Sequence, residues 1–91
     1  MGYSIYYKIE ISNWKKMITL INRICDGLGF ELIVSHDRVI IDPELGNIES
    51  LIIPKKGYGS VKTFGIEPIT TIYLLILYSL SSFGSVEVWE D

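Results

Sequence analysis

The amino-acid sequence predicts one α+β domain. Alternating apolar and polar residues near both ends indicate strands, and two segments with helical spacing follow residues 12 and 67. The chain has 91 residues, which is enough for a single compact core. Hydrophobic residues make up 48% and charged residues 21%, a composition typical of globular proteins rather than disordered ones.

The first strand and the first helix have the clearest patterns. Every odd position from Tyr3 to Ile11 is apolar or aromatic, which predicts a strand with one buried face. Ser12 is the expected helix N-cap. Apolar residues then recur on one helical stripe from Trp14 to Leu28. Gly27 and Gly29 stand where a left-handed C-terminal cap is expected.

A hairpin is predicted after this helix. Residues 30–35 and 38–42 are apolar enough for two short strands, and His36-Asp37 between them has the length of a two-residue hairpin loop. Residues 43–47 contain a proline and a glycine and are expected to form a turn.

A second hairpin is expected between this turn and the second helix. Its arms are residues 48–53 and 60–64, and residues 55–59 form the loop between them. Pro54 ends the first arm, because proline has no N–H group for a strand ladder.

The second helix is expected to begin at Glu67-Pro68 and to run to about Phe83. Proline is favoured in the first turn of a helix, and a carboxylate there complements the helix dipole. Gly84 ends the helix, and residues 86–89 alternate again as a last strand.

The resulting order is a ferredoxin-like β-α-β-β-α-β plan with an extra β-hairpin before the second helix. We expect two helices on one face of a mainly antiparallel sheet. Because this plan serves many unrelated functions, it supports no functional assignment by itself.

Charge, cysteine content and hydropathy limit the environment and the partners. The formal net charge is −3, so the chain lacks the general basic surface of nucleic-acid-binding proteins. Cys25 is the single cysteine, and the first residues do not have the pattern of a signal peptide, so a cytoplasmic location is expected. The uncharged residues 68–86 have acidic flanks and many hydroxyl groups, which favours a buried helix over a membrane span. The lack of glutamine is typical of proteins from hot habitats.

The outer face of the second helix is the strongest indication of a partner. It holds leucines, a tyrosine and small hydroxyl residues but no charge, whereas a solvated face would carry lysine and glutamate. We therefore predict a homodimer or higher homo-oligomer, or docking of another protein. The alternative is that the inserted hairpin covers this face within one chain. The predicted interface residues are Thr71, Leu74, Leu75, Tyr78 and Ser82.

A stretch rich in lysine and glycine gives the alternative function, binding of an anion or nucleic acid. Glycines let backbone N–H groups approach a phosphate, and lysines add positive charge. The spacing matches neither common phosphate-loop pattern, and lysines at a hairpin tip also discourage edge-to-edge aggregation. The candidate residues are Lys55, Lys56, Gly57, Gly59, Ser60 and Lys62.

No catalytic, metal or cofactor site is predicted. His36 is the single histidine, too few for a typical metal site. Cys25 lies on the apolar stripe of the first helix, which favours a role as a small core residue. The sequence therefore favours a non-enzymatic, self-associating interaction domain.

Overall fold

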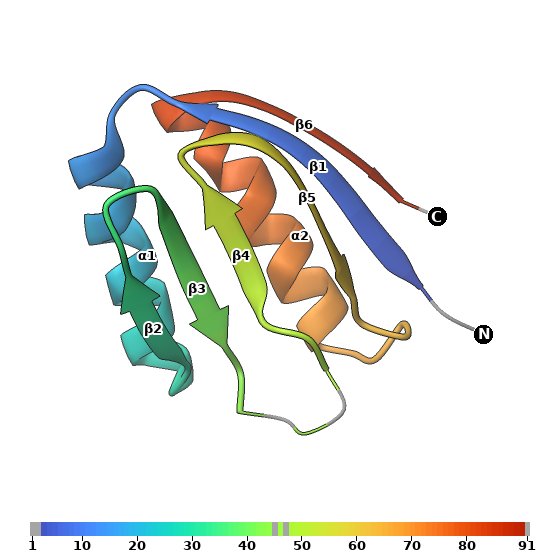
Figure 1. Cartoon of the computed structure of the whole chain (residues 1–91). Coiled ribbons are helices and arrows are strands. Elements are labelled where there is room, and N and C mark those ends of the chain that lie inside the picture. The colour runs from blue at the N-terminus through green and yellow to red at the C-terminus, as the bar shows by residue number, and fades with distance from the viewer. Residues whose placement is uncertain (1–2, 45, 47, 91) are drawn as a thin grey trace.

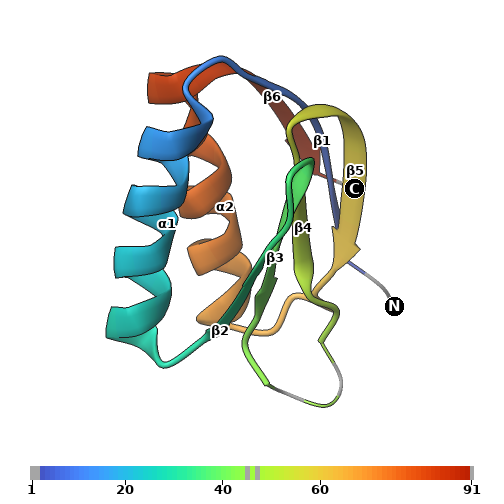
Figure 2. The ribbon, with the colours of Figure 1, turned by 60° about the vertical axis from the view of Figure 1, so that its left-hand side comes forward.

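The computed structural model describes residues 3–44, 46 and 48–90. Two helices form one layer and the strands form a second layer beside it (Figures 1 and 2). The turn predicted over residues 43–47 includes Leu45 and Asn47, which lie outside the described residues. The elements in chain order are β1 (Ser4–Ile11), α1 (Trp14–Leu28), β2 (Glu31–Val34), β3 (Arg38–Asp42), β4 (Leu51–Pro54), β5 (Lys56–Lys62), α2 (Ile69–Ser79), the 3-10 helix η1 (Leu80–Phe83) and β6 (Gly84–Glu90).

The strands form two antiparallel sheets of three strands each. Their orders are β5-β1-β6 and β2-β3-β4. The ferredoxin-like strand order is therefore not confirmed, because the predicted single sheet is divided. The two arms of the expected second hairpin pair with different partners: β4 joins β3, and β5 joins β1.

The prediction of a loop over residues 55–59 is wrong. Only Lys55 separates β4 from β5, and β5 already begins at Lys56. Gly57 and Gly59 pair with Ile9 and Tyr7 of β1. A Cβ atom at position 59 would lie 2.6 Å from Cζ of Tyr7, so this glycine is a strand position that makes room for an aromatic ring.

The ends of α1 show one correction and one confirmation. Asn13, not Ser12, is the N-cap, and its Oδ1 accepts a hydrogen bond from the Lys16 N–H at 3.4 Å. The Ser12 hydroxyl instead donates to the Phe83 carbonyl at 2.9 Å, which ties the start of α1 to the end of η1. Gly29 has φ of 73° and forms the expected left-handed C-cap.

The predicted hairpin of β2 and β3 is confirmed. The Ser35 N–H donates to the Arg38 carbonyl at 2.9 Å, and this bond closes the His36-Asp37 loop. The register places Ile33 opposite Ile40.

The second helix begins close to the predicted residue, but its α-helical part ends at Ser79 rather than at Phe83. The 3-10 helix η1 continues to Phe83 and contains Ser82. The Glu67 carboxylate accepts the Thr71 N–H at 2.9 Å and so satisfies a donor in the first turn. Thr70, in the first turn of α2, is buried, and its hydroxyl lies 2.7 Å from that of Thr63. Among the described residues, no helix is both long and apolar enough to cross a membrane.

The core lies between the helices and the strands and joins both sheets. Its largest fully buried side chains include Tyr7 of β1 and Tyr73 of α2. The Tyr7 hydroxyl donates to the Ile52 carbonyl of β4 at 2.5 Å, a contact from one sheet to the other. The Tyr73 hydroxyl donates to the Glu49 carbonyl at 2.9 Å. Both phenols bond carbonyls in or just before β4, where the sheets meet.

Candidate binding surfaces

The outer face of α2 is exposed where the sequence analysis placed an interface. Leu75 is 63% exposed and Tyr78 53% exposed. Thr71 and Ser82 are also exposed, and Leu74 is half-buried. Strands β4 and β5 lie in the strand layer (Figure 2). The inserted segment therefore does not cover this face.

A small apolar groove runs beside the exposed residues of α2. Its volume is about 340 Å³. Helix α1 contributes Ile24 and Leu28 to its lining, and α2 contributes Ile72, Leu75, Ile76 and Ser79. Ile24 and Leu28 were not among the predicted interface residues, which came from the second helix alone. The sequence does contain an indication for Leu28. It is the last residue of α1, where the apolar stripe of this helix reaches the surface.

The lysine and glycine residues do not converge on one point. Lys56 and Lys62 lie on the same face of β5 but six positions apart, which corresponds to about 20 Å along a strand. Gly57 and Gly59 are the alternate residues that pair with inward-facing positions of β1. Ser60 is exposed beside Tyr6 of β1. The stretch is therefore a regular strand rather than a phosphate loop.

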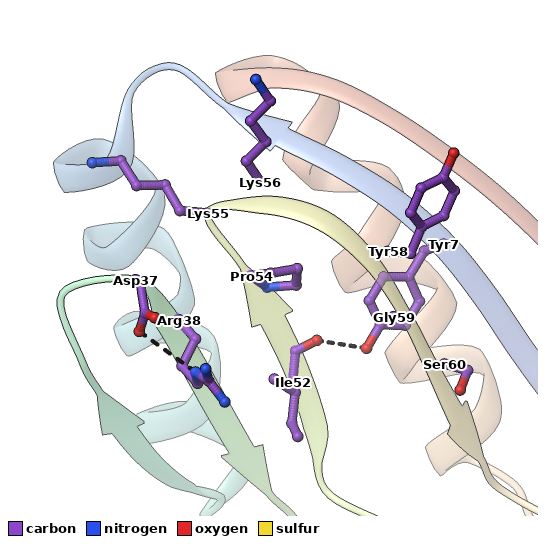
Figure 3. A pocket seen from close by; sticks show the side chains of 10 residues that line it. All are labelled: Tyr7, Asp37, Arg38, Ile52, Pro54, Lys55, Lys56, Tyr58, Gly59 and Ser60. Atoms are coloured by element: carbon purple, nitrogen blue, oxygen red, sulfur yellow. Dashed lines mark hydrogen bonds and ion pairs between the residues drawn. The ribbon is translucent and has the colours of Figure 1, made fainter.

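A pocket opens between β4 and β5 at the end of the strands where Lys55 connects them. Its volume is about 520 Å³, within the range typical of small-molecule sites. Four of the predicted anion-site residues line it, and Gly57 and Lys62 do not. Its lining residues are Tyr7, Asp37, Arg38, Ile52, Pro54, Lys55, Lys56, Tyr58, Gly59 and Ser60 (Figure 3).

Arg38 is the cation that the sequence analysis missed. It lies on β3 directly opposite Pro54 of β4, and Figure 3 shows it along the β3 wall of the pocket. The head groups of Lys55 and Lys56 point away from the middle of the pocket in the same view. Only the strand pairing brings Arg38 to this site, so spacing in the sequence gives no sign of it.

Comparisons with known proteins find no relative. No protein-family model matches the chain, and neither a functionally described protein nor a solved structure does. The surfaces must therefore be interpreted from their own chemistry.

The mouth of the pocket carries charged side chains, whereas its floor is the uncharged phenol of Tyr7. At the mouth, Nε of Arg38 lies 3.5 Å from Oδ1 of Asp37, and this guanidinium holds the pKa of the Asp37 carboxyl below its usual value. At the floor, burial raises the pKa of Tyr7 to about 12, although its hydrogen bond to Ile52 acts in the opposite direction. The Tyr7 hydroxyl is therefore protonated at neutral pH and remains a donor.

Aromatic side chains extend from the pocket across the open face of the β5-β1-β6 sheet. Tyr58 of β5 is 71% exposed, and Nζ of Lys8 lies 5.5 Å from the centroid of its ring. Tyr6 and Trp89 form a stacked pair with ring centroids 6.3 Å apart. These aromatic residues come from strands distant in the chain, so spacing in the sequence does not show that they share one sheet face.

The residues considered for catalysis lie apart. Cys25 is buried in the core, and burial raises the pKa of its thiol. His36 is exposed in the loop between β2 and β3. Within the part of the chain that the structure describes, no three His, Cys, Asp or Glu side chains are grouped to hold a metal ion.

Proposed function

We propose that the chain is a small self-associating interaction domain that docks with a second copy of itself through the outer face of α2. The exposure of Leu75 and Tyr78 beside an apolar groove carries this proposal. Fully burying a leucine side chain contributes about 1.5–3 kcal/mol, so a partner that covers this face gains from each apolar residue.

A second copy suits this face better than an unrelated partner of strong charge. Helix α2 has no charged residue from Ile69 to Ser79, so two copies meeting at a two-fold axis bring no like charges together on this helix. A ridge and a groove lie side by side: Leu75 and Tyr78 project, while Ile24 and Leu28 line the adjacent hollow. Surfaces of this kind are self-complementary in two-fold dimers.

Analytical ultracentrifugation of a matched pair of variants tests the proposal. Leu75→Glu places a charge at the centre of the contact and should convert the oligomer to a monomer. Asn22→Glu adds the same charge to an exposed position of α1 and should leave the mass unchanged. A monomeric wild type, or a Leu75→Glu variant that keeps the wild-type mass, contradicts the proposal.

The ferredoxin-like description of the fold is also a proposal. The central position of β1, flanked by β5 and β6, supports it, as does the packing of both helices on the same side of the strands (Figure 2). In this description, the strands between α1 and α2 widen the sheet, which opens between β4 and β5.

We infer that the chain has no catalytic role. We also infer that it is located in the cytoplasm. The buried position of Cys25 supports a structural rather than a nucleophilic role for its thiol. The intracellular assignment rests on the single cysteine of the sequence.

A further inference from the structure

The pocket between β4 and β5 lies over a split in the strand layer. The two strands are joined by Lys55 but belong to different sheets, with no ladder between them. In antiparallel pairs, the backbone groups of alternate residues face the partner strand. The Ile11 N–H donates to the Lys55 carbonyl, and the Thr63 N–H donates to the Tyr3 carbonyl. Odd-numbered residues of β5 therefore direct their backbone groups toward β1.

The even-numbered residues of β5 then direct their backbone groups into the split. One of them, Lys62, donates its N–H to Oε1 of Glu49 at 2.9 Å, on the side away from β1. Tyr58 and Ser60 have the same orientation by alternation. Backbone N–H and carbonyl groups of β5 thus face the pocket.

Strand β4 presents backbone groups from the opposite side. The Ile52 carbonyl accepts the Tyr7 hydroxyl, and the N–H and carbonyl of one strand residue point to the same side. The N–H of Ile52 therefore also faces the split. Because backbone N–H donors and carbonyl acceptors both face the split, it suits a planar group whose edge carries hydrogen-bond donors and acceptors.

The ends of the split restrict what enters it. At one end, the Lys55 N–H donates to the Asp37 carbonyl at 2.9 Å and holds the connection to the β2–β3 loop. At the other end, Glu49 and Lys62 bridge the strands through the bond described above. With the Tyr7 phenol as the floor, the opening is closed at both ends, which favours a small planar group over an added peptide strand.

The mouth of the pocket favours an anion. Arg38, Lys55 and Lys56 line it together with the carboxylate of Asp37, but the head groups of the two lysines point outward (Figure 3), and Nζ of Lys56 lies 4.0 Å from Oε2 of Glu10. The lining therefore has a formal charge of +2, whereas the whole chain has −3. Arginine and lysine are the side chains that bind phosphate in proteins, arginine through its planar fork.

The wall of the pocket adds aromatic and apolar surface. The exposed Tyr58 ring lies at the rim and extends over β1 (Figure 3), where Nζ of Lys8 is 5.5 Å from its centroid, and Ile52 is 42% exposed on the β4 side. Exposed aromatic rings are the usual platforms on which nucleobases stack. A basic mouth, an aromatic wall and a hydrogen-bonding split therefore occur in one pocket.

We propose that this pocket binds a nucleotide unit. The phosphate lies at Arg38, and the two exposed lysines turn inward from the rim to reach it. The base lies against Tyr58, and the edge of the base meets the backbone groups of the split. This site is on the face opposite the helices and does not depend on self-association through α2.

The nucleotide has two sources with the same chemistry, a free mononucleotide or one unit of a single strand. The stacked pair of Tyr6 and Trp89 lies next to Ser60 on the same sheet face. A single-stranded nucleic acid that leaves the pocket across β1 and β6 reaches this aromatic pair, whereas a mononucleotide does not. Comparison of ligands of different length therefore distinguishes the sources.

The test is a titration of the isotopically labelled chain followed by backbone amide chemical shifts. The probes are uridine monophosphate, inorganic phosphate and an oligouridylate of about eight nucleotides, a length within the range of single-strand sites. The proposal expects saturable shifts at Ile52, Tyr58 and Ser60 with uridine monophosphate and weaker binding of phosphate alone. The absence of saturable shifts at these amides with both nucleotide probes overturns it, as does phosphate binding as tightly as the nucleotide.

Two substitutions that change the charge of the pocket in opposite directions test the role of its basic mouth. Arg38→Gln should weaken binding by about tenfold, the effect of losing one charge-assisted contact. Asp37→Asn removes the opposing carboxylate and should tighten binding, a gain that misfolding cannot produce. Arg23→Gln removes a cation from exposed α1 and is the matched control. Equal effects of the two arginine variants overturn the proposal.

The aromatic pair distinguishes the two sources. If the oligouridylate binds at least about tenfold more tightly than the mononucleotide, and Trp89→Ala removes only that advantage, the unit belongs to a single strand. If the two ligands bind equally at the same amides, and Trp89→Ala changes neither affinity, the ligand is a free nucleotide. Both results support the site, whereas shifts confined to Tyr6 and Trp89 contradict it.

Discussion

The ring of Tyr7 lies directly over the backbone of Gly59, its cross-strand partner. A Cβ atom at position 59 would stand 2.6 Å from Cζ and 2.8 Å from the hydroxyl oxygen of Tyr7. Because no side chain occupies that space, the phenol crosses β5 and reaches the Ile52 carbonyl. One glycine thus allows one tyrosine to join the two sheets.

The first prediction follows from this packing. Gly59→Ala should destabilise the fold by about 1–3 kcal/mol, the usual cost of overpacking a core. The ring cannot move away without losing its bond to Ile52. Denaturation by urea, followed by circular dichroism, gives the change in the free energy of unfolding.

A matched glycine provides the control. Gly27 lies within α1 and has open space where a Cβ would stand, so Gly27→Ala should stabilise the chain by up to about 1 kcal/mol. The double variant Gly59→Ala with Tyr7→Leu should cost less than the sum of the two single variants, because the smaller side chain vacates the space that the new methyl group needs. Equal stabilities of the Gly59→Ala and Gly27→Ala variants contradict the packing argument.

The contact between Tyr7 and Gly59 shows why only part of the fold could be predicted from the sequence. β1, α1 and α2 follow from periodic patterns contained within each segment, and the structure has helices and a strand there. The character of residues 55–59 depends on Tyr7, which lies far away in the sequence. Two glycines and two lysines have the composition of a loop until the partner strand is known.

The candidate surfaces also differ in whether local spacing in the sequence can predict their residues. Leu75 and Tyr78 were placed on the outer face of the second helix because helical spacing is local, and both are exposed in the single chain. Arg38 and Ile52 could not be assigned to the pocket, since they meet Tyr58 only after β4 and β5 have paired with different strands.

The second prediction concerns alkaline stability. Burial raises the pKa of Tyr7 from 10.0 to about 12. Folding therefore favours the protonated phenol, and its contribution is full below about pH 10 and lost as the pH rises through about 12. The free energy of unfolding of the wild type should fall by about 2–3 kcal/mol more than that of Tyr7→Phe between about pH 9 and 12.

Urea denaturation at a series of pH values measures this difference. Tyr58→Phe is the control, because it removes the hydroxyl of an exposed ring rather than of a buried one. At neutral pH, Tyr7→Phe should also cost about 1–3 kcal/mol, since it leaves the Ile52 carbonyl without its donor. Parallel curves for the wild type and Tyr7→Phe would show that Tyr7 ionises equally in both states.

The third prediction concerns the buried hydroxyl pair that links the end of β5 to α2. Oγ1 of Thr70 lies 2.7 Å from Oγ1 of Thr63 and 2.8 Å from the Ile66 carbonyl. Thr70→Val should cost about 1–3 kcal/mol, because it leaves the Thr63 hydroxyl without this partner. The double variant with Thr63→Val should cost less than the sum of the single variants, since no hydroxyl then remains unsatisfied. Strict additivity in this double-mutant cycle would mean that the two groups do not interact.

The fourth prediction concerns Cys25. Its side chain is buried in the core, and burial raises the pKa of the thiol. Both effects slow attack on a disulfide reagent, because the thiolate is the reacting form and must reach solvent. If modification requires unfolding, an unfolding free energy of about 5 kcal/mol slows the reaction roughly 10³- to 10⁴-fold relative to the denatured chain. The absorbance of released thionitrobenzoate, recorded with and without urea, gives both rates. Equal rates would place the thiol at the surface of the native fold and reopen a nucleophilic role, whereas a slowed rate that follows stability across the variants above identifies Cys25 as a core residue.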